Sequence, residues 1–180
     1  MEAMSRRLRS WTAGLEENHA LDVYARRFEP TTRRLVGAGR RRDFLRGRWL
    51  GHSFHPLLTD FPLGAWASAS FLDLFGNDDA RSAAETLVAF GVVAAVPTAL
   101  AGLADWAEAD QRSKRVGVAH AGLNSAVFGL YASSLVARRA NRHRLGVALG
   151  ISGGLTAWVS GYLGGHLSLV RDAGRDREIT

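Results

Sequence analysis

Three long stretches of the sequence contain no charged residue, and they constrain the fold more than any other feature. They cover residues 86–104, 116–137 and 145–170, and a fourth stretch, 54–76, has only Asp60 and Asp73 as charges. A helix that crosses the hydrocarbon core of a bilayer needs about 20 mostly apolar residues. A helix on the surface of a soluble protein would carry charged side chains along one face, and the first three stretches have none. The sequence therefore predicts an all-α, polytopic membrane protein with four transmembrane helices.

The linkers between the four stretches are short, and this predicts how the helices are arranged. Helices joined by such linkers run antiparallel, so residues 51–170 are expected to form an up-down four-helix bundle. Small residues recur at every fourth position from Gly117 to Ser133 and let helix backbones approach closely, either within one chain or in a homo-oligomer. Residues 1–50 form a separate Arg-rich segment, and residues 171–180 form a polar tail.

The basic residues are distributed unevenly along the chain. There are 23 Lys and Arg against 17 Asp and Glu, and twelve arginines precede Gly51. Because loops rich in Lys and Arg stay on the cytoplasmic side, this predicts a multi-pass protein of the bacterial cytoplasmic (inner) membrane with both termini in the cytoplasm. The linker 138–144, which carries four arginines, favours the opposite orientation.

The N-terminal segment has apolar residues at roughly helical spacing beside its arginines. They are Leu8, Trp11, Leu15, Leu21, Tyr24 and Phe28, and the pattern is expected to end near Pro30. Such a segment is typical of an amphipathic helix that lies on the membrane surface and is held by anionic lipid. Binding of nucleic acid by the same arginines is the weaker interpretation, since a membrane protein already requires basic residues at this position.

The composition excludes several kinds of chemistry. With no cysteine the sequence cannot form disulfides, thiolate zinc sites, or iron–sulfur clusters held by cysteine. The sequence also lacks the P-loop, the G-x-S-x-G motif and the H-E-x-x-H motif. The common enzyme signatures are therefore absent, and the sequence leaves open whether the protein is an enzyme.

Polar and ionisable residues concentrate at one set of helix ends, on the cytoplasmic side in the predicted topology. They are His52, His55, Asp60, Asp105, His120, Asn124 and His166. His120 is the fifth residue of the third stretch and His166 the fifth from the end of the fourth, so both are expected at the same depth. Ionisable groups are costly in a bilayer and either pair with one another or serve a function. Asp73, at the other end of its helix, is expected to be a solvated helix terminus.

This cluster is compatible with several functions. His120 and His166, with His55 as a third candidate, could ligate haem b, and the same three histidines could instead bind a divalent metal with help from a carboxylate. A His–Asp relay could carry protons. In the alternative interpretation the polar residues only cap and join the helix ends of a non-catalytic scaffold or partner subunit. A transporter is less favoured, because no inverted repeat is evident.

Five ordered motifs resemble a family of bacterial four-span membrane domains of unknown function. They are G-H-S-F-H-P-L-L-T-D-F-P-L-G-A-W at 51–66, S-F-L-D-L-F-G at 70–76, A-G-L-A-D-W at 101–106, H-A-G-L-N at 120–124 and G-Y-L-G-G-H-L at 161–167. The matching positions include the polar residues named above and Asp73. Members of that family are often joined to, or encoded with, Rieske-type iron–sulfur or c-type cytochrome domains, which implies electron transfer. Since this chain has no cysteine, a redox role would need a separate partner or a bound haem.

Overall fold

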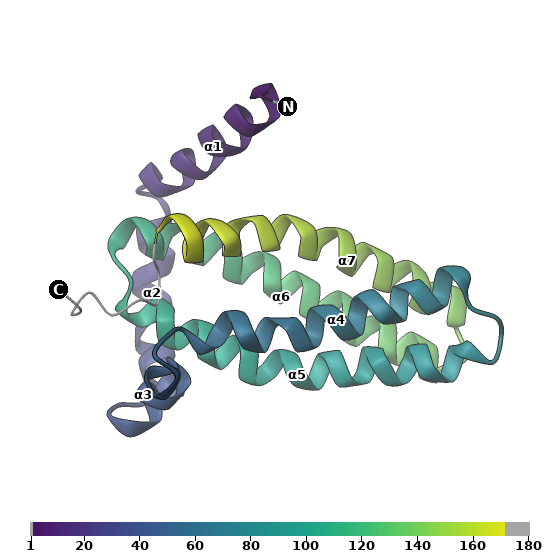
Figure 1. Cartoon of the computed structure of the whole chain (residues 1–180). Helices are drawn as coiled ribbons and strands as arrows, with labels where there is room; N and C mark the ends of the chain where they lie inside the picture. Colours follow the sequence, from purple (N-terminus) through teal and green to yellow (C-terminus); the bar gives the residue numbers. More distant parts are fainter. Residues whose placement is uncertain (1, 172–180) are drawn as a thin grey trace. The chain divides into compact units, whose positions relative to one another are not determined.

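The computed structural model describes residues 2–171, and every regular element in that part of the chain is a helix. The prediction of an all-α protein is thereby confirmed for these residues. Figure 1 shows the helices in chain order, and their bounds are α1 Glu2–Glu17, α2 Leu21–Val36, α3 Arg40–Leu45, η1 Arg48–Leu50, α4 Phe54–Phe75, α5 Ala80–Glu108, α6 Gln111–Arg139, α7 His143–Gly165 and η2 His166–Val170.

Helices α4 to α7 coincide with the four apolar stretches. Helices α5 and α6 begin before and end after the uncharged residues, because polar side chains can continue a helix beyond its apolar part. The last stretch is not one regular helix: α7 ends at Gly165, and a π-helical turn, η2, continues to Val170. Of the helices in residues 2–171, α5 alone is long and apolar enough by length and composition to cross a membrane. Four spans therefore remain a prediction.

The N-terminal segment differs from the expected single pattern that ends near Pro30. It forms two helices, α1 and α2, separated at residues 18–20, and α2 continues through Pro30 to Val36. A proline inside a helix removes one backbone hydrogen bond to the carbonyl four residues earlier. Pro30 is exposed on α2, so the carbonyl that loses its donor is able to bond to water instead.

The chain divides into two compact units, and the long helices contribute residues to both. Unit 1 contains Met1–His55, Leu100–Gly122 and Gly161–Thr180, of which residues 2–171 are described, and unit 2 contains Pro56–Ala99 and Leu123–Ser160. The predicted polar cluster divides accordingly. His52, His55, Asp105, His120 and His166 belong to unit 1, whereas Asp60, Asp73 and Asn124 belong to unit 2.

The core of unit 2 is built around a stacked aromatic pair. The rings of Trp66 on α4 and Tyr131 on α6 are parallel, with centroids 4.0 Å apart, and Ala69, Ala84, Val88 and Val127 complete the buried cluster. Gly91 on α5 lies against the Trp66 indole so closely that a Cβ there would clash with it. The glycine is therefore required for α5 to approach the aromatic pair.

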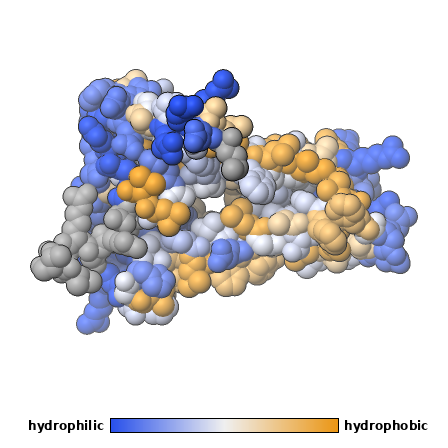
Figure 2. All heavy atoms as spheres, turned by 45° about the horizontal axis from the view of Figure 1, so that its top comes forward, coloured by the Kyte–Doolittle hydropathy of each residue, from blue (hydrophilic) through white to orange (hydrophobic). Residues whose placement is uncertain are grey.

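Large apolar side chains are also exposed on all four helices of unit 2. Phe71, Val93, Val136 and Trp158, one from each of α4 to α7, are between 62% and 83% exposed. Figure 2 shows hydrophobic side chains over the helical surface of this unit and hydrophilic ones where its helices end. An apolar surface of this kind is unfavourable in water and suits contact with lipid.

In unit 1, ion pairs join α2 to the first turns of α6. The Arg115 guanidinium donates to both carboxylate oxygens of Asp22, at 2.7 and 2.9 Å, and Lys114 Nζ lies 3.2 Å from Glu29. The hydrogen bond from Arg115, with a further one from Gln111, holds the pKa of Asp22 far below its usual range. The pKa of Glu29 is lowered by hydrogen bonds from Arg33 and Lys114. These acidic residues are therefore ionised at neutral pH and stabilise the docking of α2.

Candidate functional site

Two of the predicted histidines lie together in unit 1. The rings of His55, near the start of α4, and His120, in the first half of α6, have centroids 6.4 Å apart and planes at 86° to each other. Both side chains are partly buried. The sequence anticipated that these residues share one end of the bundle, and the structure places their imidazoles as neighbours.

A glycine backbone lies against each imidazole. A Cβ added to Gly102 of α5 would be 2.9 Å from two atoms of the His55 ring, and one added to Gly164 of α7 would be 3.1 Å from the His120 ring. A Cβ at 2.9 Å from the His55 ring would clash with it, because real Cβ atoms essentially never come so close to a neighbour. A Cβ at 3.1 Å from the His120 ring would be tighter than most real contacts. The two glycines thus allow α5 and α7 to hold the rings in place, a role that residue spacing alone did not reveal.

Asp105, near the end of α5, is tied to the segment that leads into α4. Its carboxylate accepts a short hydrogen bond from the Ser53 hydroxyl, and Arg46 Nε lies 4.0 Å from the same carboxylate. Both Asp105 and Arg46 are buried. A buried carboxylate requires such partners, because its desolvation would otherwise cost several kcal/mol.

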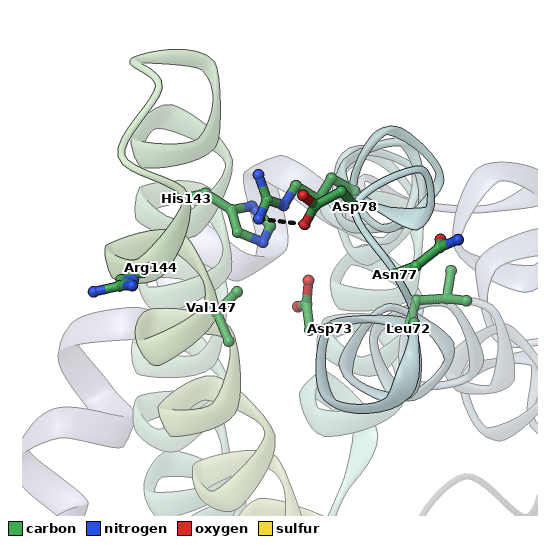
Figure 3. A pocket seen from close by; sticks show the side chains of 9 residues that line it. Leu72, Asp73, Asn77, Asp78, His143, Arg144 and Val147 are labelled. Atoms are coloured by element: carbon green, nitrogen blue, oxygen red, sulfur yellow. Dashed lines mark ion pairs between the residues drawn. The ribbon is translucent and has the colours of Figure 1, made fainter.

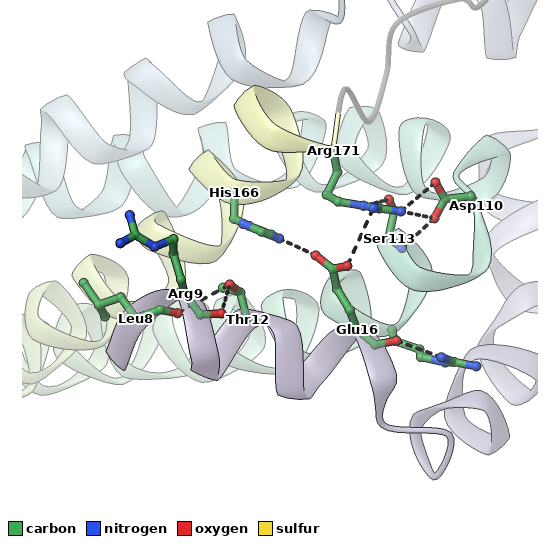
Figure 4. A network of polar contacts seen from close by, with 9 residues as sticks. Leu8, Arg9, Thr12, Glu16, Asp110, Ser113, His166 and Arg171 are labelled. Atoms are coloured by element: carbon green, nitrogen blue, oxygen red, sulfur yellow. Dashed lines mark hydrogen bonds and ion pairs between the residues drawn. The ribbon is translucent and has the colours of Figure 1, made fainter. Parts of the chain in front are cut away.

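His166 contacts the N-terminal helix, as Figure 4 shows. Its Nε2 lies 2.7 Å from Glu16 Oε1 of α1, and Arg171 approaches the other carboxylate oxygen of Glu16 at 3.6 Å. Arg171 also donates to both oxygens of Asp110 at 2.9 Å. Burial opposes the ionisation of Asp110, but hydrogen bonds from the Ser113 backbone and from Arg171 outweigh it and lower the pKa of Asp110. His166 therefore belongs to a network of hydrogen bonds and ion pairs that also contains Glu16, Arg171 and Asp110.

The other predicted residues lie in different surroundings. His52 is exposed, and its Nδ1 lies 3.0 Å from the Ser53 carbonyl. In unit 2, Asn124 accepts a hydrogen bond of 3.0 Å from the Ser160 hydroxyl. Asp60 is exposed and has no hydrogen bond or ion pair with the residues that the structure describes. No group of three or more His, Asp or Glu side chains within residues 2–171 is arranged to hold a metal ion.

Asp73 is not a solvated helix terminus, and this expectation was wrong. Its carboxylate forms a bidentate ion pair with Arg138 of α6, with Nη–O distances of 2.9 and 2.5 Å, and the two side chains are 3% and 1% exposed. Asp73 lines a cavity of about 320 Å³ at the ends of the helices of unit 2 (Figure 3). Asp78, Arg81, His143 and Arg144 also line this cavity, with Asp78 and Arg81 paired at 2.6 Å. A partner 65 residues away decided the burial of Asp73, and no local pattern indicates it.

The helical architecture and the apolar surface exposed on unit 2 are those expected of a helical membrane protein. Residues 51–177 match the sequence profile of a family described as "Predicted membrane protein (DUF2231)". Since the match covers more than half of the chain, the protein belongs to this family. It covers the region of the five sequence motifs and confirms their resemblance to an uncharacterised membrane domain. No curated protein matches the chain, and no solved structure matches it.

Proposed function

We propose that this membrane protein takes part in electron transfer and that His55 and His120 together bind its redox centre, either haem b or a single metal ion. The observation that carries the proposal is the 6.4 Å separation of the two imidazole centroids. A metal ion or haem iron that bound one nitrogen of each ring would hold the two centroids about 5–6 Å apart, because each metal–nitrogen bond is about 2.0 Å long. The observed separation is close to this range.

The surroundings of the pair support the same proposal. Gly102 and Gly164 present backbone rather than side chains to the two rings, which fixes the ring positions without a bulky neighbour. The His166 imidazole is placed with Glu16, whereas the rings of His55 and His120 are neighbours, so we assign the ligands to His55 and His120 and give His166 a structural role. A haem bound here would supply one-electron chemistry, and His55 and His120 would supply the nitrogens that hold it.

The proposal includes a topology and a kind of partner. Four transmembrane helices would place the histidine pair near the cytoplasmic face of the inner membrane, with both termini in the cytoplasm, as the distribution of basic residues indicates. With no cysteine in the chain, the electron donor or acceptor would be a separate protein, such as a Rieske-type or cytochrome subunit of the kind the resemblance implies. A homo-oligomer remains compatible with this arrangement.

The test is an absorbance spectrum of the protein purified in mild detergent, oxidised and then reduced, with metal analysis of the same sample. The expected result is a Soret band that shifts on reduction, or one metal ion per chain. His55→Ala and His120→Ala are each expected to lose that band or that metal ion. His52→Ala and His166→Ala are the matched controls, because they remove the same kind of side chain outside the pair. Protein that stays colourless and metal-free after incubation with excess haem would overturn the proposal.

A specific observation also supports a second candidate, a non-catalytic scaffold or partner subunit. Most of the other predicted polar residues have partners within the chain, including Asp105 with Ser53, His166 with Glu16 and Asp73 with Arg138. In a scaffold, His55→Ala and His120→Ala would lower thermal stability or assembly. Unchanged stability together with lost electron transfer would count against this candidate and in favour of the first.

A further inference from the structure

Helix α2 presents two chemically different faces, and the structure gives a partner to only one of them. Ala25, Thr32 and Val36 are buried on the first face, and Asp22 and Glu29 lie beside them. This face docks on α6 through the ion pairs of Asp22 with Arg115 and Glu29 with Lys114. Acidic residues of α2 are thus used for contacts within the protein.

The second face is apolar and exposed. Tyr24, Phe28 and Leu35 are between 46% and 53% exposed and follow the i, i+4, i+11 spacing of one helix face. Arg27 and Arg34 border this stripe, since 100° per residue places them next to it. Neither arginine forms an ion pair with any residue from 2 to 171. Hydrophobic and aromatic side chains beside uncompensated arginines form a surface that is costly to leave in water.

The position of α2 defines what this face meets. The residues that bind α2, Lys114 and Arg115, immediately precede Val116, the first residue of an uncharged stretch of α6. Figure 1 shows α2 crossing the end of α6 rather than running along it. In a membrane protein, a helix held across the end of an uncharged helix lies at the level of the lipid headgroups.

We infer that the face of α2 formed by Tyr24, Phe28 and Leu35, with Arg27 and Arg34, docks on a leaflet of anionic phospholipid. The aromatic and aliphatic side chains enter the boundary between headgroups and acyl chains, and the two arginines bind lipid phosphates. This inference rests on membership of a membrane protein family and not on the histidine pair, so the two proposals can fail separately.

The absence of cysteine makes a direct measurement possible. In the full-length protein Phe28→Cys creates a unique site for a nitroxide spin label, and Arg26→Cys creates a matched site on the same helix. Residues two apart on a helix point about 200° away from each other. In liposomes of phosphatidylglycerol and phosphatidylcholine, the label at position 28 is expected to be more accessible to oxygen than to a water-soluble nickel complex. The label at position 26 is expected to show the reverse.

A pair of charge variants tests the lipid class. In the Phe28→Cys protein, Arg27→Gln with Arg34→Gln is expected to reduce the docked-to-free ratio of α2 about fivefold for each arginine removed. Arg26→Gln, compared with Arg27→Gln alone, makes the same charge change outside the face and should leave the ratio unchanged. The Phe28→Cys protein with both arginines in place should also dock α2 less on liposomes of pure phosphatidylcholine than on the mixture with phosphatidylglycerol.

Three results would overturn the inference. A label at position 28 that is as accessible to the nickel complex as the label at position 26 would show that this face meets water. A label shielded from both reagents would show that a protein partner covers it. Insertion that is equal in the two lipid mixtures, or unaffected by loss of Arg27 and Arg34, would exclude recognition of anionic lipid.

Discussion

The imidazoles of His55 and His120 lie nearly perpendicular to each other, and each rests on a glycine of another helix. His55 of α4 lies against Gly102 of α5, and His120 of α6 lies against Gly164 of α7. One pair of side chains therefore brings together all four long helices within unit 1. The position of the rings depends on the absence of two Cβ atoms as much as on the histidines themselves.

Substitution of either glycine should disturb the histidine pair. Gly102→Ala and Gly164→Ala each place a methyl group against an imidazole, and overpacking of this kind costs about 1–3 kcal/mol. Both variants are expected to unfold at lower temperature in detergent and to bind less haem or metal. Gly122→Ala is the control, because nothing lies within 4 Å of its added Cβ, and it should be neutral or slightly stabilising. Equal unfolding temperatures of the three variants would show that Gly102 and Gly164 do not lie against the two imidazoles.

The ion pair of Asp73 and Arg138 should be sensitive to the loss of one partner. Arg138→Met leaves a buried carboxylate without its cation, which costs about 3–5 kcal/mol of unfolding free energy. The double variant Asp73→Leu with Arg138→Met removes both charges and is expected to recover most of the loss. The measurement is the midpoint of unfolding, with the exposed Arg139→Met as control. A double variant no more stable than the single one would contradict the prediction.

The contact between Glu16 and His166 should hold α1 against the end of α7. Glu16→Gln weakens the hydrogen bond to His166 and removes the ion pair with Arg171 in a partly buried site, at a cost of about 1–3 kcal/mol. Amide hydrogen exchange in residues 2–17 is therefore expected to accelerate. Glu17→Gln changes the next residue, which has no hydrogen bond or ion pair within residues 2–171, and exchange should stay at its original rate.

Acidification should release α2 from α6. The pKa of Glu29 is lowered from its ordinary value of 4.5 by hydrogen bonds from Arg33 and Lys114, and the pKa of Asp22 is lowered from 3.8 chiefly by Arg115. A carboxylate with a depressed pKa stabilises the folded state fully above its unfolded pKa and loses that effect as the pH falls through its folded pKa. Docking should therefore be unchanged from neutral pH down to about 4.5 and should weaken below it.

A nitroxide label at Arg26→Cys gives the measurement, since its mobility should rise only in the acidic range. The variant Asp22→Asn with Glu29→Gln should show the mobile spectrum already at neutral pH. A label that becomes mobile between neutral pH and about 5 would point to a different titrating group.

The sequence predicted the long helices well because their signal is local. Runs with few or no charges identify α4 to α7 to within a few residues at several of their ends, and the depth of His120 in its run singled it out. The end of α2 was predicted too early, since one exposed proline does not stop a helix whose other face is docked. Gly102, Gly164 and Glu16 were missed, because their importance lies in contacts with residues far along the chain.

The sequence by itself determined the helical class and the resemblance to a membrane protein family, and it predicted that the histidines share one set of helix ends. These properties follow from the apolar runs, the position of the arginines and the order of the helices, all of which are local in the chain. The tertiary structure decided that His55 faces His120, that His166 binds Glu16 and that Asp73 is buried with Arg138. Each of these pairs joins residues at least 65 positions apart in the chain. The spacing of residues along one helix does not specify which side chain of another helix they contact. The packing of the helices against one another decides that contact.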